Sequence, residues 1–257
     1  MFIDVVDTAG GTRFKAEVMG ADALTARAPL AVFSHGNGGS YQIYRALLAA
    51  LVDAGWVVAA FDHPGNHRKD DHLKGTKQNL EDRPRHISLL IDELLAQVPV
   101  DRQRIAAIGH SLGGYTALAL AGGQGYSREH EPLTVRADPR VQALVLLAPA
   151  AFWFLAPESL RAVTVPMLIL EAEHDELTPA WHGQLIAGGV ADRAQVTQRT
   201  EAGAGHFSFI SPFPPAMRRA DFPPANDPAG FDREAFHRRY PAEVVAYLNR
   251  VLPPAAA

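Results

Sequence analysis

The chain contains no cysteine among its 257 residues. Disulfide bonds, thiol nucleophiles and cysteine-ligated metals are therefore excluded. The lack of cysteine leaves the redox compartment open, because a chain of this length can bury a large apolar core without covalent cross-links.

Long apolar runs and clusters of positive charge are missing as well. No stretch of about 18 apolar residues is present, so the sequence predicts no membrane span. The acidic N-terminal stretch 1–7 lacks a basic region followed by an apolar segment, so no signal peptide is expected and a cytoplasmic location is the default. The formal net charge is −4 with no block of Lys or Arg, which argues against a nucleic-acid partner. The oligomeric state is left open.

Short apolar runs alternate with helical periodicity from about residue 30 to the end, which is typical of a parallel sheet wrapped on both faces. Buried strands are expected at 30–34, 56–61, 104–108, 141–147, 165–170 and 195–200, after a hairpin at 2–6 and 12–18. We therefore predict one α/β domain over residues 1–257, with a mostly parallel, twisted, eight-stranded sheet. Only a short link separates 141–147 from 165–170, so no large cap domain is expected.

The most informative motif is G-x-S-x-G at residues 109–113. The apolar run 104–108 precedes it and an Ala- and Leu-rich segment follows it, as a strand and a packed helix would. Strand, sharp turn and helix around this motif are typical of a nucleophile elbow, in which a strained turn exposes the serine hydroxyl. The sequence therefore predicts Ser111 as a nucleophile, although a glycine-rich turn with an incidental serine would also fit the pentapeptide alone.

A serine nucleophile needs a base and an acid, which follow it in the chain order Ser, Asp or Glu, His. We expect Asp175 to be the acid, because it follows the strand 165–170 in a D-x-x-x-P loop; Glu171 and Glu173 lie nearer the strand and fit structural roles. We expect His206 to be the base, because it is the only histidine between the last strand and the final helix and its flanking glycines free the loop. A solvated acidic loop and a surface histidine are the alternatives.

Two backbone N–H groups should stabilise the negative charge of the tetrahedral intermediate. One is expected from Leu112, which follows the nucleophile and opens a helix, and the other from Asn37 in the glycine-rich loop after the strand 30–34. A plain turn is the alternative for that loop.

Two further groups of residues lie outside these motifs: three aromatic residues and the polar segment 63–72. Phe152, Trp153 and Phe207 are candidates for an apolar substrate pocket, although each fits the core equally well. The histidines and aspartates of 63–72 fit no tight metal-binding spacing, so we expect a polar loop and no metal site.

These segments resemble the α/β-hydrolase superfamily, and more narrowly its dienelactone-hydrolase-like branch, including bacterial relatives of platelet-activating-factor acetylhydrolase. The resemblance covers most of the chain in the expected order, at 33–40, 62–65, 82–84, 109–114 and 203–207. It implies ester hydrolysis through Ser111, Asp175 and His206, with Asn37 and Leu112 as oxyanion donors and without metal or organic cofactor. Dienelactone hydrolases use a cysteine nucleophile, which this chain lacks, so dienelactone itself is not the expected substrate.

The expected function is hydrolysis of small, short-chain carboxylic esters through an acyl-enzyme intermediate. An amidase, peptidase or thioesterase would use the same groups on another leaving group. A non-catalytic scaffold that binds a ligand or a protein is the third possibility, although such scaffolds typically lack one of these elements, and here all are present.

Overall fold

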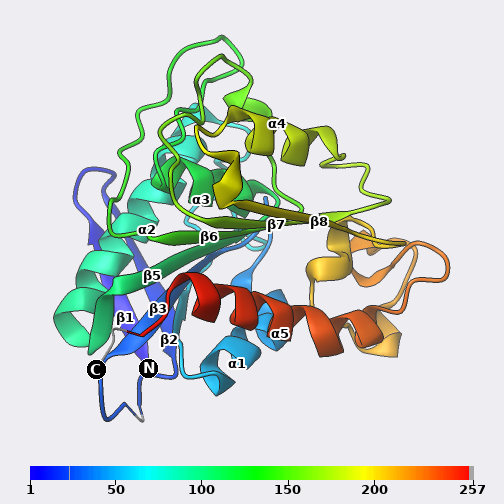
Figure 1. Ribbon diagram of the computed structural model, residues 1–257, viewed down its shortest axis with the longest axis horizontal. Coiled ribbons are helices and arrows are strands. Elements are labelled where there is room, and N and C mark those ends of the chain that lie inside the picture. The colour runs from blue at the N-terminus through cyan, green and yellow to red at the C-terminus, as the bar shows by residue number, and fades with distance from the viewer. Residues whose placement is uncertain (23, 255–257) are drawn as a thin grey trace.

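The structure is a computed structural model, which describes residues 1–22 and 24–254. Its centre is an eight-stranded sheet in the order β1-β2-β4-β3-β5-β6-β7-β8 (Figure 1). β1 and β2 join antiparallel at one edge, and all pairs from β4 to β8 are parallel. The strands are β1 (Phe2–Asp7), β2 (Thr12–Met19), β3 (Ala28–Ser34), β4 (Val57–Ala60), β5 (Val100–His110), β6 (Ala143–Leu147), β7 (Met167–Ala172) and β8 (Val196–Glu201).

Helices cover both faces of the sheet (Figure 1). α1 (Arg45–Asp53) and α5 (Arg233–Val251) pack on one face; α2 (Lys77–Gln97), α3 (Leu112–Leu120) and α4 (Trp181–Gly189) pack on the other. The predicted architecture, a mostly parallel eight-stranded sheet with helices on both faces and no large cap domain, is confirmed for the described residues. Within the described residues, no helix combines the length and the apolar character that crossing a membrane requires.

The central strand β3 explains why the sheet is covered on both sides. All seven of its residues are buried. Leu30 and Val32 belong to the core under α2 and α3, whereas Ala31 and Phe33 belong to the core under α1 and α5. Strands buried on both faces read as continuous apolar runs, which is the pattern seen in the sequence. The parallel strands β3 to β8 all end at the same edge, where the functional loops begin.

Helix α2 begins earlier than the sequence indicates. Asp82-Arg83-Pro84 has the composition of a helix start, since proline is favoured in the first turn. In the structure, however, Thr76 caps the helix by accepting a hydrogen bond from Asn79 N at 3.1 Å, and Pro84 lies inside it. Because proline has no backbone N–H, position 84 cannot donate the helical hydrogen bond that Leu80 O would otherwise accept. The hydroxyl of Tyr115 on α3 donates to Leu80 O at 3.2 Å and replaces it. The local sequence does not indicate that the helix continues through Pro84, because this compensation comes from another helix.

Candidate active site

Ser111 occupies the sharp turn between β5 and α3 with a strained backbone. Its φ is 55° and its ψ is −118°, a region that residues with a side chain rarely adopt. Three backbone hydrogen bonds hold the turn: Ser111 N donates to Leu147 O at 3.0 Å, and Ser111 O accepts from Gly114 N and Ala150 N at 2.9 Å. The strain is therefore fixed by the neighbouring strand and loop.

Gly109 and Gly113 are required by close packing at this turn. A Cβ on Gly109 would lie 2.0 Å from Gly113 O, and a Cβ on Gly113 would lie 1.9 Å from Ser34 O. No real Cβ tolerates such contacts with backbone atoms. Both motif glycines thus allow β5, α3 and the end of β3 to meet behind Ser111.

Asp175 and His206 come together at the ends of β7 and β8. His206 Nδ1 donates to Asp175 Oδ2 at 2.8 Å, since a carboxylate can only accept. Thr178 adds a third group: its Oγ1 lies 2.8 Å from Asp175 Oδ2 and 3.1 Å from His206 Nδ1. All three side chains are buried. This tautomer leaves His206 Nε2 free to accept a proton.

The Asp175 carboxylate is stabilised in its charged form. Burial by itself would raise its pKa, but the hydrogen bonds and charge of His206, together with the Thr178 hydrogen bonds, lower the pKa below the ordinary value. Leu177 N and Thr178 N donate to Asp175 Oδ1 at 2.9 and 2.7 Å. The carboxylate is thus held from both sides in one orientation.

The other acidic candidates of this loop make contacts away from the imidazole. Glu171 Oε2 accepts from Gln198 Nε2 at 2.8 Å, and Glu173 Oε2 accepts from Gly203 N at 2.7 Å. These contacts tie β7 and its loop to β8, which is the structural role considered for both residues.

His110 connects the Ser111 turn to the His206 loop. Its Nε2 donates to His206 O at 3.0 Å, and the Tyr44 hydroxyl donates to its Nδ1 at 2.8 Å. The rings of His110 and His206 lie 4.8 Å apart. The Ser111 hydroxyl makes no hydrogen bond to the described residues, and such bonds are often long in a free enzyme and shorten when substrate binds.

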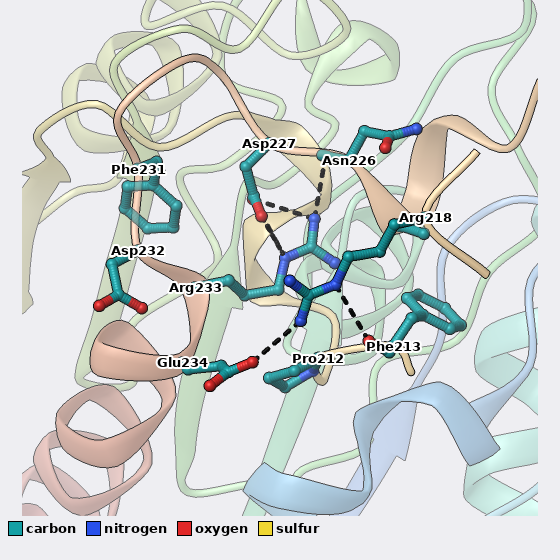
Figure 2. A pocket seen from close by; sticks show the side chains of 10 residues that line it. Pro212, Phe213, Arg218, Asn226, Asp227, Phe231, Asp232, Arg233 and Glu234 are labelled. Carbon is teal, nitrogen blue, oxygen red and sulfur yellow. Dashed lines mark hydrogen bonds and ion pairs between the residues drawn. The ribbon is translucent and has the colours of Figure 1, made fainter. Parts of the chain in front are cut away.

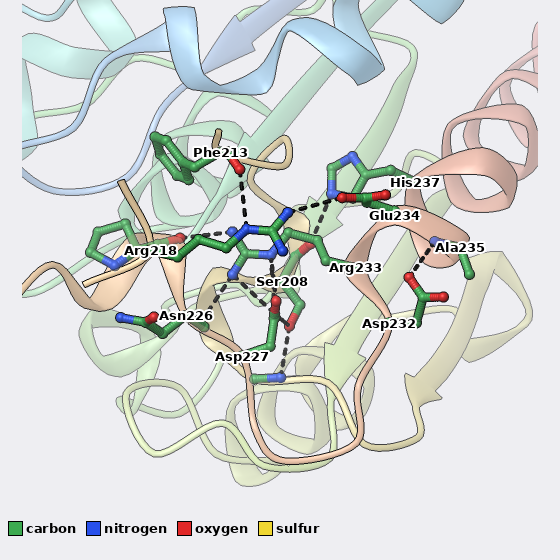
Figure 3. A network of polar contacts seen from close by, with 12 residues as sticks. Ser208, Phe213, Arg218, Asn226, Asp227, Asp232, Arg233, Glu234, Ala235 and His237 are labelled. Atoms are coloured by element: carbon green, nitrogen blue, oxygen red, sulfur yellow. Dashed lines mark hydrogen bonds and ion pairs between the residues drawn. The ribbon is translucent and has the colours of Figure 1, made fainter. Parts of the chain in front are cut away.

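A second polar network holds the His206 loop from the other side (Figure 3). The Ser208 hydroxyl accepts from Gly205 N at 3.0 Å and donates to Asp227 Oδ1 at 2.7 Å. Arg233 forms an ion pair with Asp227 at 2.9 Å and is itself buried. His237 Nε2 donates to Ser208 O at 2.9 Å. The segment carrying His206 is therefore fixed by residues from the loop before α5 and from α5 itself.

A pocket of about 470 Å³ lies beside this network, around Arg233 and the exposed ion pair of Arg218 with Glu234 (Figure 2). Four of its charged side chains form two ion pairs, Arg218 with Glu234 and Arg233 with Asp227, and Asp232 caps α5 by accepting a hydrogen bond from Ala235 N at 2.8 Å. The pocket thus belongs to the scaffold behind the His206 loop.

The loop after β3 presents Asn37 beside Ser111. His35 Nε2 accepts from His63 N at 3.0 Å, so its Nδ1 carries the proton and donates to Gly36 O at 2.7 Å. Gly36 O belongs to the peptide group whose N–H is that of Asn37. The buried imidazole therefore orients the expected oxyanion donor, and burial together with the charge of Arg83 keeps the pKa of His35 far below its ordinary value.

A pocket of about 590 Å³ opens onto the Ser111 turn. Ser111, Leu112 and Asn37 all contribute to its wall, as does Thr178. Leu112 is the first residue of α3, so its N–H has no acceptor within the helix and belongs to the positive end of the helix dipole. The arrangement can bind a carbonyl group with its oxygen near two amides.

Of the three aromatic residues expected in a substrate pocket, only Trp153 lines this one. Phe152 is 48% exposed, and Phe207 packs against the core under α1 and α5. Among the described residues, no three His, Asp or Glu side chains are grouped as metal ligands, and His63 lies in the buried network behind Asn37.

Several residues of the site were missed in the sequence. Thr178 could have been noticed as a hydroxyl three residues after Asp175. Arg83 shares the apolar face of α2 with Leu80, Ile87 and Leu90, at helical spacing, which signals a buried cation. The pocket wall also carries charged residues that belong to no motif: Lys74, Arg128 and Glu129 lie in loops, and Lys77 is the first residue of α2.

Comparison with known proteins identifies the family. The family described as serine aminopeptidase, S33, matches residues 26–157, which is 132 of 257 residues and just over half of the chain. The match includes Asn37, Ser111 and Leu112 and ends before Asp175 and His206. A comparison with curated proteins gave no significant match.

Solved structures share the fold at low sequence identity. A Mycobacterium tuberculosis puromycin-hydrolyzing peptidase matches with a TM-score of 0.69 and 15% identity, over 98% of this chain and 39% of that one. Thermogutta terrifontis esterase 2, phosphoramylated by tabun, matches with a TM-score of 0.66 and 18% identity, over 98% of this chain and 96% of that one. A Pyrobaculum calidifontis esterase matches with a TM-score of 0.65 and 20% identity, over 97% of this chain and 85% of that one. The chain belongs to the serine aminopeptidase S33 family and is a hydrolase with the α/β-hydrolase fold.

Proposed function

We propose that the protein is a serine esterase that cleaves small carboxylic esters through Ser111, His206 and Asp175. The observation that carries the proposal is one pocket wall containing the strained Ser111, the free Leu112 N–H and the Asn37 loop, next to the Asp175–His206 pair. Each group has the chemical character that acyl transfer requires.

The proposed reaction has two halves. His206 Nε2 takes the proton from the Ser111 hydroxyl as its oxygen attacks the ester carbonyl, and Asp175 stabilises the imidazolium formed. The amides of Asn37 and Leu112 stabilise the oxyanion. His206 then gives the proton to the departing alkoxide, leaving an acyl-serine. Water then takes the place of the alcohol: His206 takes a proton from water as its oxygen adds to the acyl carbon. The bond from the acyl carbon to Ser111 Oγ breaks, His206 returns the proton to Ser111 Oγ, and the carboxylic acid is released.

The lengths of the structural neighbours support an esterase. The two named esterases align over nearly all of this chain and over 96% and 85% of their own. The named peptidase is matched over only 39% of its length, so much of that protein has no counterpart here. The motifs quoted above resemble those of the dienelactone-hydrolase-like branch, and that resemblance implies hydrolysis of carboxylic esters.

An aminopeptidase is the second candidate, because the matching family carries that description. Such an enzyme must bind the ammonium group of its substrate next to the scissile bond, which requires acidic groups. Glu129 is the single carboxylate of the pocket wall and Arg128 adjoins it in the chain, whereas Lys74 and Lys77 of the wall are ion-paired with Asp71 and Glu131. A wall with one carboxylate beside a cation favours a neutral ester over a cationic peptide terminus.

Purified protein should be assayed with p-nitrophenyl esters of increasing acyl length, acyl-thioesters and aminoacyl p-nitroanilides. We expect the highest kcat/KM for short-chain esters and labelling of Ser111 by a fluorophosphonate probe. Ser111→Ala should lose both, with kcat reduced by about 10⁴-fold or more. Faster turnover of an aminoacyl anilide than of any ester would refute the esterase proposal in favour of the peptidase, and failure of the probe to label Ser111 would refute both.

A further inference from the structure

Arg83 is a buried guanidinium without a carboxylate partner. It is 1% exposed, and within residues 1–22 and 24–254 no Asp or Glu forms an ion pair with it. Burial lowers its pKa to about 9, against the opposing effect of the Tyr44 and Tyr115 hydroxyls. An unpaired charge in the interior is costly unless hydrogen bonds compensate it.

The compensation comes from four neutral acceptors (Ser34 Oγ, His35 O, Asn66 Oδ1 and Thr116 Oγ1). Arg83 Nη2 donates to Ser34 Oγ at 3.2 Å and to His35 O. Nη1 donates to Asn66 Oδ1 at 2.8 Å, and Nε donates to Thr116 Oγ1 at 3.1 Å. One planar group thereby joins the end of β3, the loop after β4 and helix α3.

Two of these contacts lead to the two expected oxyanion donors. Asn66 Nδ2 donates to Asn37 Oδ1 at 2.8 Å, so Arg83 is connected through one amide side chain to the loop that supplies the Asn37 N–H. Thr116 donates to Leu112 O at 3.1 Å, so Arg83 is also connected to the first turn of α3. The two remaining direct contacts, to Ser34 Oγ and His35 O, hold the end of β3 and the chain just before Gly36.

We propose that Arg83 is a positioning residue for the oxyanion hole, which fixes the separation of the Asn37 and Leu112 amides by bridging the loop and the helix that carry them. The inference rests on the esterase function proposed above. Two amides on separate elements can both face one oxygen only if those elements are held in register. Arg83 touches no substrate, since it lies on the protein side of both elements and is absent from the pocket wall.

The test compares Arg83→Met and Arg83→Lys with Arg85→Met as a matched control. Arg85 lies two residues further along α2 and forms ion pairs with Asp7 and Asp82. Neither partner belongs to the Ser111 turn or to the Asn37 loop. The measured quantities are kcat and KM for a short-chain p-nitrophenyl ester, the Ki of an acyl trifluoromethyl ketone, and the melting temperature. The ketone forms a tetrahedral adduct with Ser111 and therefore reports on the oxyanion hole directly.

For Arg83→Met we expect kcat to fall about 10²-fold, as on losing an oxyanion donor, with KM changed less than about threefold. The Ki of the ketone should rise by the same factor as kcat/KM falls. Arg83→Lys keeps a positive charge but lacks the planar fork that reaches all four acceptors, so we expect about a tenfold loss in kcat with the same parallel. Arg85→Met should leave both constants unchanged.

If Arg83→Met does not fold, Arg83→Lys decides the question by itself. A folded variant with wild-type kcat and Ki, a loss that falls on KM alone, or an equal loss in Arg85→Met would each overturn the inference. If the wild-type protein cleaves esters and the Arg83 variants have the same kcat and Ki as wild type, the positioning role is overturned and the esterase function stands. A wild-type protein that neither cleaves esters nor reacts with a fluorophosphonate would overturn the esterase function, and this inference with it.

Discussion

Buried neutral histidines should make the protein sensitive to mild acid, and His110 allows the effect to be calculated. His110 is 1% exposed, and its two hydrogen bonds fix the neutral tautomer. Burial, followed by the nearby His206, lowers its pKa from 6.5 to about 3. The folded state therefore resists protonation of His110, whereas the unfolded chain accepts the proton. Stability from this group is complete above pH 6.5 and is lost as pH falls below that value.

The magnitude follows from linkage. At pH 5 the unfolded histidine is almost fully protonated and the folded one is neutral, so His110 lowers the free energy of unfolding by about 2 kcal/mol relative to pH 8. The figure depends mainly on the unfolded pKa, because folded His110 stays neutral at pH 5 for any value well below 5.

The assay is urea denaturation at pH 8 and pH 5 for wild-type protein and His110→Gln. Glutamine can still donate to His206 O but does not titrate, so the variant should lose about 2 kcal/mol less than wild type between the two pH values. The exposed His130→Gln is the control and should behave as wild type. An equal pH dependence in wild type and His110→Gln would refute the reasoning.

Two further predictions concern single hydroxyl groups. Thr178→Val preserves the shape of the side chain but removes its hydrogen bond at 2.8 Å to Asp175. The pKa of Asp175 should therefore rise, and ester kinetics should show kcat reduced by about tenfold with KM unchanged. An unchanged kcat would count against a role for this hydroxyl. Tyr115→Phe leaves Leu80 O without its donor and should cost about 1–3 kcal/mol in urea denaturation, and adding Pro84→Ala should recover part of that loss by restoring a backbone N–H. Strict additivity of the two changes would contradict this account of the proline.

The residues of the candidate site were easier to find in the sequence than their supports. G-x-S-x-G identified the Ser111 turn because glycine is the only residue that fits positions 109 and 113. Chain order then singled out Asp175 and His206, which the structure brings to 2.8 Å from each other. Their catalytic roles remain predictions for the experiments above. Thr178 and Arg83 lie in no motif, since their function depends on partners that are distant in the chain.

The sequence by itself determined the architecture of this protein, because apolar strands buried on both faces and alternating helices leave few other ways to cover a parallel sheet. Tertiary structure alone decided where α2 begins, since the carbonyl freed by Pro84 is satisfied by Tyr115 of another helix. It also decided which aromatic residue lines the pocket and which polar groups surround Arg83. Local patterns report periodicity along the chain, whereas hydrogen-bond compensation depends on which distant segments meet.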